Sequence, residues 1–253
     1  MQEYVKVDIK DQIGSIEFFH PQSNSLPNYI LKKLAQSITE AGKNPEIKVI
    51  VLKSGGERAF CAGASFDELI QINNLKQGEK FFSGFADVIN AIRKCPKFII
   101  GRVQGKTVGG GVGIACAVDY CFATKYASAK LSELAIGIGP FVVGPAVERK
   151  LKTSAFSAMS INADKWFDAN WAKEQGMYVE VFESNEEMDE EIKSLTSKLI
   201  KYSPEAMKSL KNILWKDTQE WDTLLYERAK ISGELVLSEF AKETILKIKN
   251  GIS

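Results

Sequence analysis

The chain has 253 residues, of which 45% are hydrophobic and 26% are charged. Its 33 Lys and Arg residues nearly balance its 32 Asp and Glu residues, which leaves a formal net charge of +1. This composition excludes intrinsic disorder and lacks the basic excess of a nucleic-acid-binding protein, and the length suits one large folded unit.

The first part of the chain predicts alternating strands and helices. Residues 4–9 and 15–19 alternate between apolar and polar side chains and predict a β-hairpin. Apolar residues recur at helical spacing over residues 30–41, and residues 49–52 form the continuous apolar run of a strand covered on both faces. The order strand, helix, strand predicts a parallel pair with a right-handed crossover.

The alternation continues to residue 123. A long helix is expected over residues 66–94, a strand over residues 98–103, and another strand over residues 120–123. Between those strands, three consecutive glycines begin a short apolar helix that ends at Ala117. These elements predict an α/β fold.

The last quarter of the chain shows no strand pattern. Amphipathic stretches at residues 188–202, 204–214 and 221–248 predict three helices. We therefore divide the chain into a β/α core, residues 1–185, and a C-terminal helical segment, residues 186–253. An apolar stripe without a core of its own would suit packing against another subunit.

No part of the sequence predicts a membrane span or a metal site. The longest apolar stretch, residues 108–118, is about half of the ~20 residues that a bilayer requires. The first residues alternate apolar and charged side chains, unlike a secretory signal, so we expect a cytoplasmic protein. Four cysteines without a C-x-x-C pair, together with a single histidine, favour neither a zinc site nor a Cys–His nucleophile.

The glycine-rich stretch after residue 100 does not fit the nucleotide-binding motifs. Only three residues separate Gly101 from the Gly105-Lys106-Thr107 triplet, whereas a P-loop requires four. The neighbouring glycines also fail to form G-x-G-x-x-G. ATP and NAD are therefore disfavoured as ligands.

The same glycines favour a site for a developing oxyanion. They lead from a strand into a helix, whose first amides carry a partial positive charge. A second loop of small residues, at 60–65, also joins a strand to a helix. Because such loops lie at one edge of a parallel sheet, Ala64 and Gly109 could direct two backbone N–H groups at one point.

One carboxylate interrupts the apolar run at residues 130–140. A buried glutamate without a partner is costly, so Glu133 is either turned to solvent or kept for proton transfer with a raised pKa. Spacing alone leaves both interpretations open.

Three ordered motifs together resemble the enoyl-CoA hydratase/isomerase (crotonase) superfamily. They are Phe60-Cys-Ala-Gly-Ala64, Val103-Gln-Gly-Lys-Thr-Val-Gly109-Gly-Gly, and Leu131-Ser-Glu133 with Gly137 and Pro140. The resemblance covers nearly the whole chain. Residues 112–114, 131–134 and 140–147 are most similar to bacterial members of the methylglutaconyl-CoA hydratase type, which act in leucine breakdown.

The resemblance implies a crotonase-like spiral of β-β-α turns with a C-terminal helical trimerisation segment. The expected assembly is a homotrimer or a dimer of trimers. The expected partner is an acyl-CoA thioester substrate, with no cofactor beyond the coenzyme A of that substrate. Neither nucleic acid nor a membrane is expected as a partner.

The resemblance also assigns site residues. It implies that Ala64 and Gly109 supply the oxyanion-hole amides and that Glu133 is the general acid/base. The residues expected to contact the substrate are Ala62, Gly63, Ser65, Gly110, Gly113, Pro140 and Phe141.

One departure from the family pattern bears on the reaction. Hydratases of the superfamily commonly hold a water between two glutamates, and the first of these falls on Gly113 here. We expect a hydratase that acts on a branched or carboxylated enoyl-CoA through Glu133 alone. The alternatives are an enoyl-CoA Δ-isomerase that uses the same glutamate and a non-catalytic acyl-CoA-binding scaffold.

Overall fold

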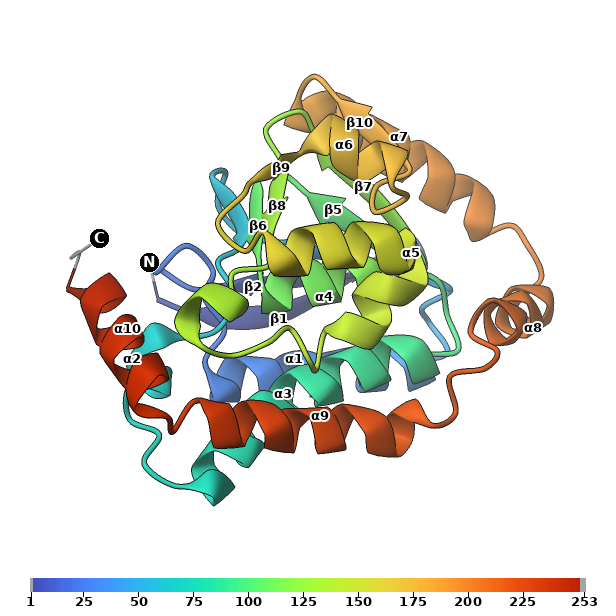
Figure 1. Ribbon diagram of the computed structural model, residues 1–253. Helices are drawn as coiled ribbons and strands as arrows, with labels where there is room; N and C mark the ends of the chain where they lie inside the picture. Colours follow the sequence, from blue (N-terminus) through green and yellow to red (C-terminus); the bar gives the residue numbers. More distant parts are fainter. Residues whose placement is uncertain (1, 251–253) are drawn as a thin grey trace.

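Two β-sheets and the helices around them make up the protein, of which the computed structural model describes residues 2–250 (Figure 1). The larger sheet has six strands in the order β1-β2-β3-β5-β7-β10, and the smaller has four in the order β4-β6-β8-β9. The strands of the larger sheet are β1 (Tyr4–Lys10), β2 (Ile13–Phe19), β3 (Val49–Ser54), β5 (Ile99–Val103), β7 (Tyr120–Thr124) and β10 (Glu180–Phe182). Those of the smaller sheet are β4 (Ala59–Cys61), β6 (Lys106–Val108), β8 (Ser128–Lys130) and β9 (Phe167–Asp168).

From β3 to β8, successive strands alternate between the two sheets. After the antiparallel hairpin of β1 and β2, the strands β3, β5 and β7 join the larger sheet in parallel. Each is followed by a short strand, β4, β6 or β8, that joins the smaller sheet, also in parallel. The fold is therefore the expected spiral of β-β-α turns, and the predicted parallel pairing of residues 15–19 with residues 49–52 is confirmed.

Helices cover both sheets. They are α1 (Asn28–Lys43), α2 (Phe66–Leu69), α3 (Leu75–Lys94), α4 (Gly110–Ala117), α5 (Gly144–Ile161), α6 (Ala169–Glu174), α7 (Asn185–Leu199), α8 (Pro204–Leu214), α9 (Trp221–Leu235) and α10 (Glu239–Lys249), with a 3-10 turn, η1, at Leu134–Ile136. α4 is apolar throughout because every one of its residues is buried. No helix in residues 2–250 has the length and apolar character that crossing a bilayer requires.

Two of the predicted helices are in fact pairs. The segment at 66–94 divides into α2 and α3, because the Asn74 side chain accepts a hydrogen bond from the Gln77 N–H at 3.0 Å and begins a new helix. The segment at 221–248 divides into α9 and α10 at Ser238, whose hydroxyl accepts from the Ala241 N–H at 3.2 Å. Both breaks are side-chain N-caps.

The C-terminal helices pack on their own chain. α9 runs beside α3 (Figure 1), and its Leu225 and Ala229 are fully buried in the main core. α8 is fastened by a buried ion pair in which the Lys211 Nζ lies 2.8 Å from the Asp119 Oδ2. The apolar stripe that we expected to lack a core therefore shares the core of residues 1–185.

Candidate active site

A cavity of about 580 Å³, mouth included, lies where the loops after β4 and β6 meet the segment after β8. It is lined by Ala62, Gly63, Ala64, Phe66, Leu69, Phe82, Phe85, Val108, Gly109, Gly110, Ser132, Glu133, Ile136, Ile138, Gly139, Pro140, Phe141, Val142, Val143 and Ser232. Five of the residues expected to contact the substrate are among them, namely Ala62, Gly63, Gly110, Pro140 and Phe141.

The two small-residue loops touch each other. β4 and β6 are parallel neighbours, so the chain leaves both strands at the same edge of the smaller sheet. At Gly63, which has φ +87°, a Cβ would lie 3.0 Å from the Val108 oxygen and 3.8 Å from the Gly110 nitrogen. Only glycine permits this approach. The predicted convergence of the two loops is thus present.

Within the first loop, Ala64 has the free amide. The Ala62 N–H donates to the Ser23 oxygen at 3.1 Å, and the Gly63 N–H donates to the Cys61 Sγ at 3.3 Å. No acceptor for the Ala64 N–H occurs among residues 2–250. This amide is therefore available to a ligand in the cavity, as expected.

In the second loop, the free amide is not the one that was expected. Gly109, expected to supply an oxyanion-hole amide, donates its N–H to the Lys130 oxygen at 2.8 Å, a bond at the edge where β6 pairs with β8. The available amide is that of Gly110, the first residue of α4, which has no preceding turn to bond. Gly110 had been expected only to contact the substrate. The helix dipole adds positive potential at this position.

Gly109 instead makes room for the acid. Its φ of +51° and ψ of −115° favour glycine, and a Cβ there would lie 2.9 Å from the Glu133 Oε1. The Glu133 carboxylate therefore rests against Gly109, the residue that precedes the free amide of Gly110.

Glu133 faces the cavity rather than bulk solvent. The residue is partly exposed, but its Oε2 is buried and has no hydrogen-bond partner within residues 2–250. Burial raises the pKa of Glu133 from its ordinary value of 4.5 to about 7, and a backbone hydrogen bond opposes this only in part. A carboxyl that titrates near neutral pH can both take and return a proton.

The position expected for a second glutamate is closed. A Cβ at Gly113 would lie 2.5 Å from the Val143 Cγ1 and 2.6 Å from the Val143 Cβ. Gly113 thus lies beneath Val143 and does not line the cavity, which corrects its expected contact with the substrate. Among the cavity-lining residues within 2–250, Glu133 is the only one with an ionisable side chain.

Ser65 also departs from the expectation. It is 3% exposed, and its hydroxyl accepts a hydrogen bond from the Glu68 N–H at 3.4 Å, which caps α2. Because this cap turns the side chain to the helix, Ser65 does not line the cavity.

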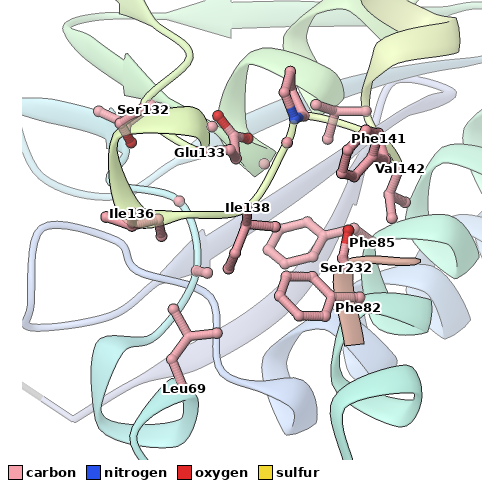
Figure 2. A pocket seen from close by; sticks show the side chains of 18 of the residues that line it. Leu69, Phe82, Phe85, Ser132, Glu133, Ile136, Ile138, Phe141, Val142 and Ser232 are labelled. Atoms are coloured by element: carbon pink, nitrogen blue, oxygen red, sulfur yellow. The ribbon is translucent and has the colours of Figure 1, made fainter. Parts of the chain in front are cut away.

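The wall of the cavity that lies away from Glu133, here called the far wall, was not predicted from the sequence. Figure 2 shows the rings of Phe82 and Phe85, from α3, beside Ser232, from α9, with Glu133 at the opposite side. These residues lie far from the motifs along the chain. Their only signal in the sequence is the glycine pair, Gly78 and Gly233, that lets α3 and α9 approach.

Within residues 2–250, no group of three or more His, Cys, Asp or Glu side chains could hold a metal ion.

The chain is also similar to known proteins in sequence and in fold. The family model described as enoyl-CoA hydratase/isomerase matches residues 8–247. The chain belongs to this family. The resemblance of its three motifs to the superfamily is thereby confirmed.

Curated relatives that are named for different reactions are similar to this chain in sequence. A probable enoyl-CoA hydratase of Bacillus subtilis is 26% identical over 93% of this chain and 92% of its own length. A short-chain-enoyl-CoA hydratase of Clostridium acetobutylicum is 28% identical over 88% and 85%. A peroxisomal Delta(3,5)-Delta(2,4)-dienoyl-CoA isomerase of Arabidopsis thaliana is 26% identical over 85% and 83%.

The methylglutaconyl-CoA hydratase of Rattus norvegicus is also similar, with 29% identity over 66% of this chain and 52% of its own length.

Among solved structures, an enoyl-CoA hydratase from Bacillus halodurans superposes with a TM-score of 0.89 at 19% identity, covering 96% of this chain and 99% of that one. The structural likeness supports the fold.

Proposed function

We propose that this protein binds an enoyl-CoA thioester with the thioester oxygen between the amides of Ala64 and Gly110. Both N–H groups are free and belong to loops in contact, and one of them begins a helix. Preorganised donors of this kind stabilise an enolate, and each contributes about 10²–10³ in rate.

The reaction that the site supports best is movement of the double bond from C3 to C2. Glu133 takes a proton from C2, and the electron pair moves through the thioester into the oxygen held by the two amides. The same carboxyl then returns the proton to C4. One acid with a pKa of about 7 suffices for both transfers.

One observation carries this choice, namely the contact between Gly113 and Val143. Holding a water for addition to C3 from two sides needs a second acid, and Val143 fills the space where it would begin. Hydration through Glu133 alone is the second candidate, and the hydratase names of the relatives in Bacillus subtilis and Clostridium acetobutylicum favour it.

The test is to supply the enzyme with 3-hexenoyl-CoA and, separately, with 2-hexenoyl-CoA. Isomerisation converts the first to the second, whereas hydration converts the second to 3-hydroxyhexanoyl-CoA. Glu133→Gln should lower the faster rate about 10²–10⁴-fold. Turnover of neither compound, together with tight binding of both, would instead support a non-catalytic scaffold.

We also propose that the protein assembles as a trimer or a dimer of trimers. Three large apolar side chains of α8 are exposed, namely Leu210 at 49%, Ile213 at 63% and Leu214 at 48%. Light scattering of the full chain tests this, and a monomer at micromolar concentration would contradict it.

A further inference from the structure

The far wall of the acyl cavity is built by a close crossing of two helices. A Cβ at Gly78 of α3 would lie 2.8 Å from the Gly233 Cα of α9, and one at Gly233 would lie 2.6 Å from the Glu79 nitrogen. Both approaches involve backbone atoms, so the helices touch through their main chains. This contact brings Ser232 against the cavity, next to the rings of Phe82 and Phe85 (Figure 2).

In the part of the chain that the structure describes, residues 2–250, no positively charged side chain lines the wall opposite Glu133. Besides Glu133, the polar side chains from these residues that line the cavity are the hydroxyls of Ser132 and Ser232. Ser232 is 1% exposed, and its hydroxyl donates to the Arg228 oxygen of its own helix at 3.3 Å. The Arg228 side chain, one turn earlier on α9, is not part of the cavity lining.

A carboxylate placed against this wall would lose its hydration without gaining a cation. Such a group is costly to bury, because the interior repays its desolvation only when a partner charge and hydrogen bonds are present. It would also share one apolar cavity with the carboxyl of Glu133, and two like charges in such surroundings repel each other.

We infer that the cavity selects an uncharged acyl chain that ends against Ser232, Phe82 and Phe85, and that it excludes acyl groups with a second carboxylate. The inference rests on the proposed function, since it concerns the thioester bound at that site. Methylglutaconyl-CoA, the substrate type that the motif resemblance suggested, carries such a carboxylate and is therefore not expected to be a substrate of this protein.

The experiment compares two saturated thioesters of equal chain length by calorimetry, valeryl-CoA and glutaryl-CoA. They differ only in the terminal group, a methyl or a carboxylate, so the coenzyme A contacts cancel. Valeryl-CoA should bind at least about a hundredfold more tightly. Equal or tighter binding of glutaryl-CoA would overturn the inference, and binding of neither would overturn the proposed function and this inference with it.

A matched pair of variants tests the wall itself. Ser232→Lys places a cation at the far end, whereas Ser232→Met adds similar length without charge. The lysine variant should improve glutaryl-CoA binding relative to valeryl-CoA by about tenfold or more, and the methionine variant should not. Improvement in both variants, or in neither when both are folded, would contradict the assignment of the far wall.

Wild-type turnover gives an independent readout. 3-Methylcrotonyl-CoA and 3-methylglutaconyl-CoA share a branched enoyl unit and differ by the terminal carboxylate. If either reacts, the uncharged compound should have the larger kcat/KM, and a preference for the carboxylated compound would overturn the inference even if the variants fail to fold.

Discussion

Replacing Glu133 with glutamine should make the protein more stable at alkaline pH while it removes the proposed catalytic acid. Burial raises the pKa of this carboxyl from 4.5 to about 7. A pKa difference of one unit between the folded and unfolded chains corresponds to about 1.4 kcal/mol in the free energy of unfolding. Ionising Glu133 in the folded protein therefore lowers the free energy of unfolding by up to about 3 kcal/mol. Glutamine has a similar shape and no charge to desolvate.

The direction of this stability difference follows from whether the folded or the unfolded chain binds the Glu133 proton more tightly. Below about pH 4.5 the carboxyl is protonated in both folded and unfolded chains, so Glu133→Gln should leave the free energy of unfolding nearly unchanged. Between pH 4.5 and about 7 the unfolded chain releases its proton first, and the wild-type protein loses stability relative to the variant. Above pH 7 the difference is constant.

Thermal unfolding at pH 4.5 and pH 8 measures this difference. For a chain of this size, about 3 kcal/mol corresponds to a rise in Tm of roughly 6–12 °C in the variant at pH 8. Glu57→Gln, at an exposed position, is the matched control and should show no such rise. If Glu133→Gln has the same effect at both pH values, the carboxylate is not desolvated in the folded protein and the acid/base assignment loses its physical basis.

Three further predictions concern packing around the site and the C-terminal helices. Gly109→Ala should lower kcat at least about tenfold in steady-state assays, because its Cβ would displace the Glu133 carboxyl, the proposed acid/base; unchanged kcat in a folded variant would refute this contact. Val143→Ala should destabilise the wild-type protein but stabilise Gly113→Glu, a reversal that urea unfolding of the four proteins detects; destabilisation in both backgrounds would contradict it. Lys211→Met should lower the free energy of unfolding by about 3–5 kcal/mol, because it leaves the buried carboxylate of Asp119 without its partner charge. A loss below about 1 kcal/mol in urea titration would show that this ion pair does not stabilise the packing of α8.

The order of long elements was predictable because their hydrophobic periods are unambiguous. The helix α1 and the parallel strands β3, β5 and β7 follow from runs of five or more residues. The strands of the smaller sheet were not predicted by periodicity, because β4, β6 and β8 have three residues each. These short strands nevertheless place both loops of the site.

The missed helix break at Asn74 had a signal in the sequence. Asn74 is followed three residues later by Gln77, whose side chain accepts a hydrogen bond from the Asn73 N–H at 3.0 Å. This reciprocal pattern resembles a capping box and marks a helix start inside a continuous amphipathic stretch. Apolar spacing alone cannot reveal such a break, because α2 and α3 both present buried faces.

The site was predictable as a set of loops but not atom by atom. The two glycine- and alanine-rich loops and Glu133 are present as expected. Which amide is free, Gly109 or Gly110, depends on where the pairing of β6 with β8 ends, and no residue pattern encodes that end. The burial of Glu133 likewise depends on segments distant in the chain.

The close fit of Gly113 under Val143 bears on how such enzymes diversify. An ancestor with this packing could not acquire a second acid at position 113 by one substitution, because the new side chain would collide with the valine. Trimming the valine first would leave a void and weaken the fold before any new activity appeared. With this packing, a one-acid site and a two-acid site are therefore separated by a loss of stability, and passing from one to the other requires a stability reserve or two changes together.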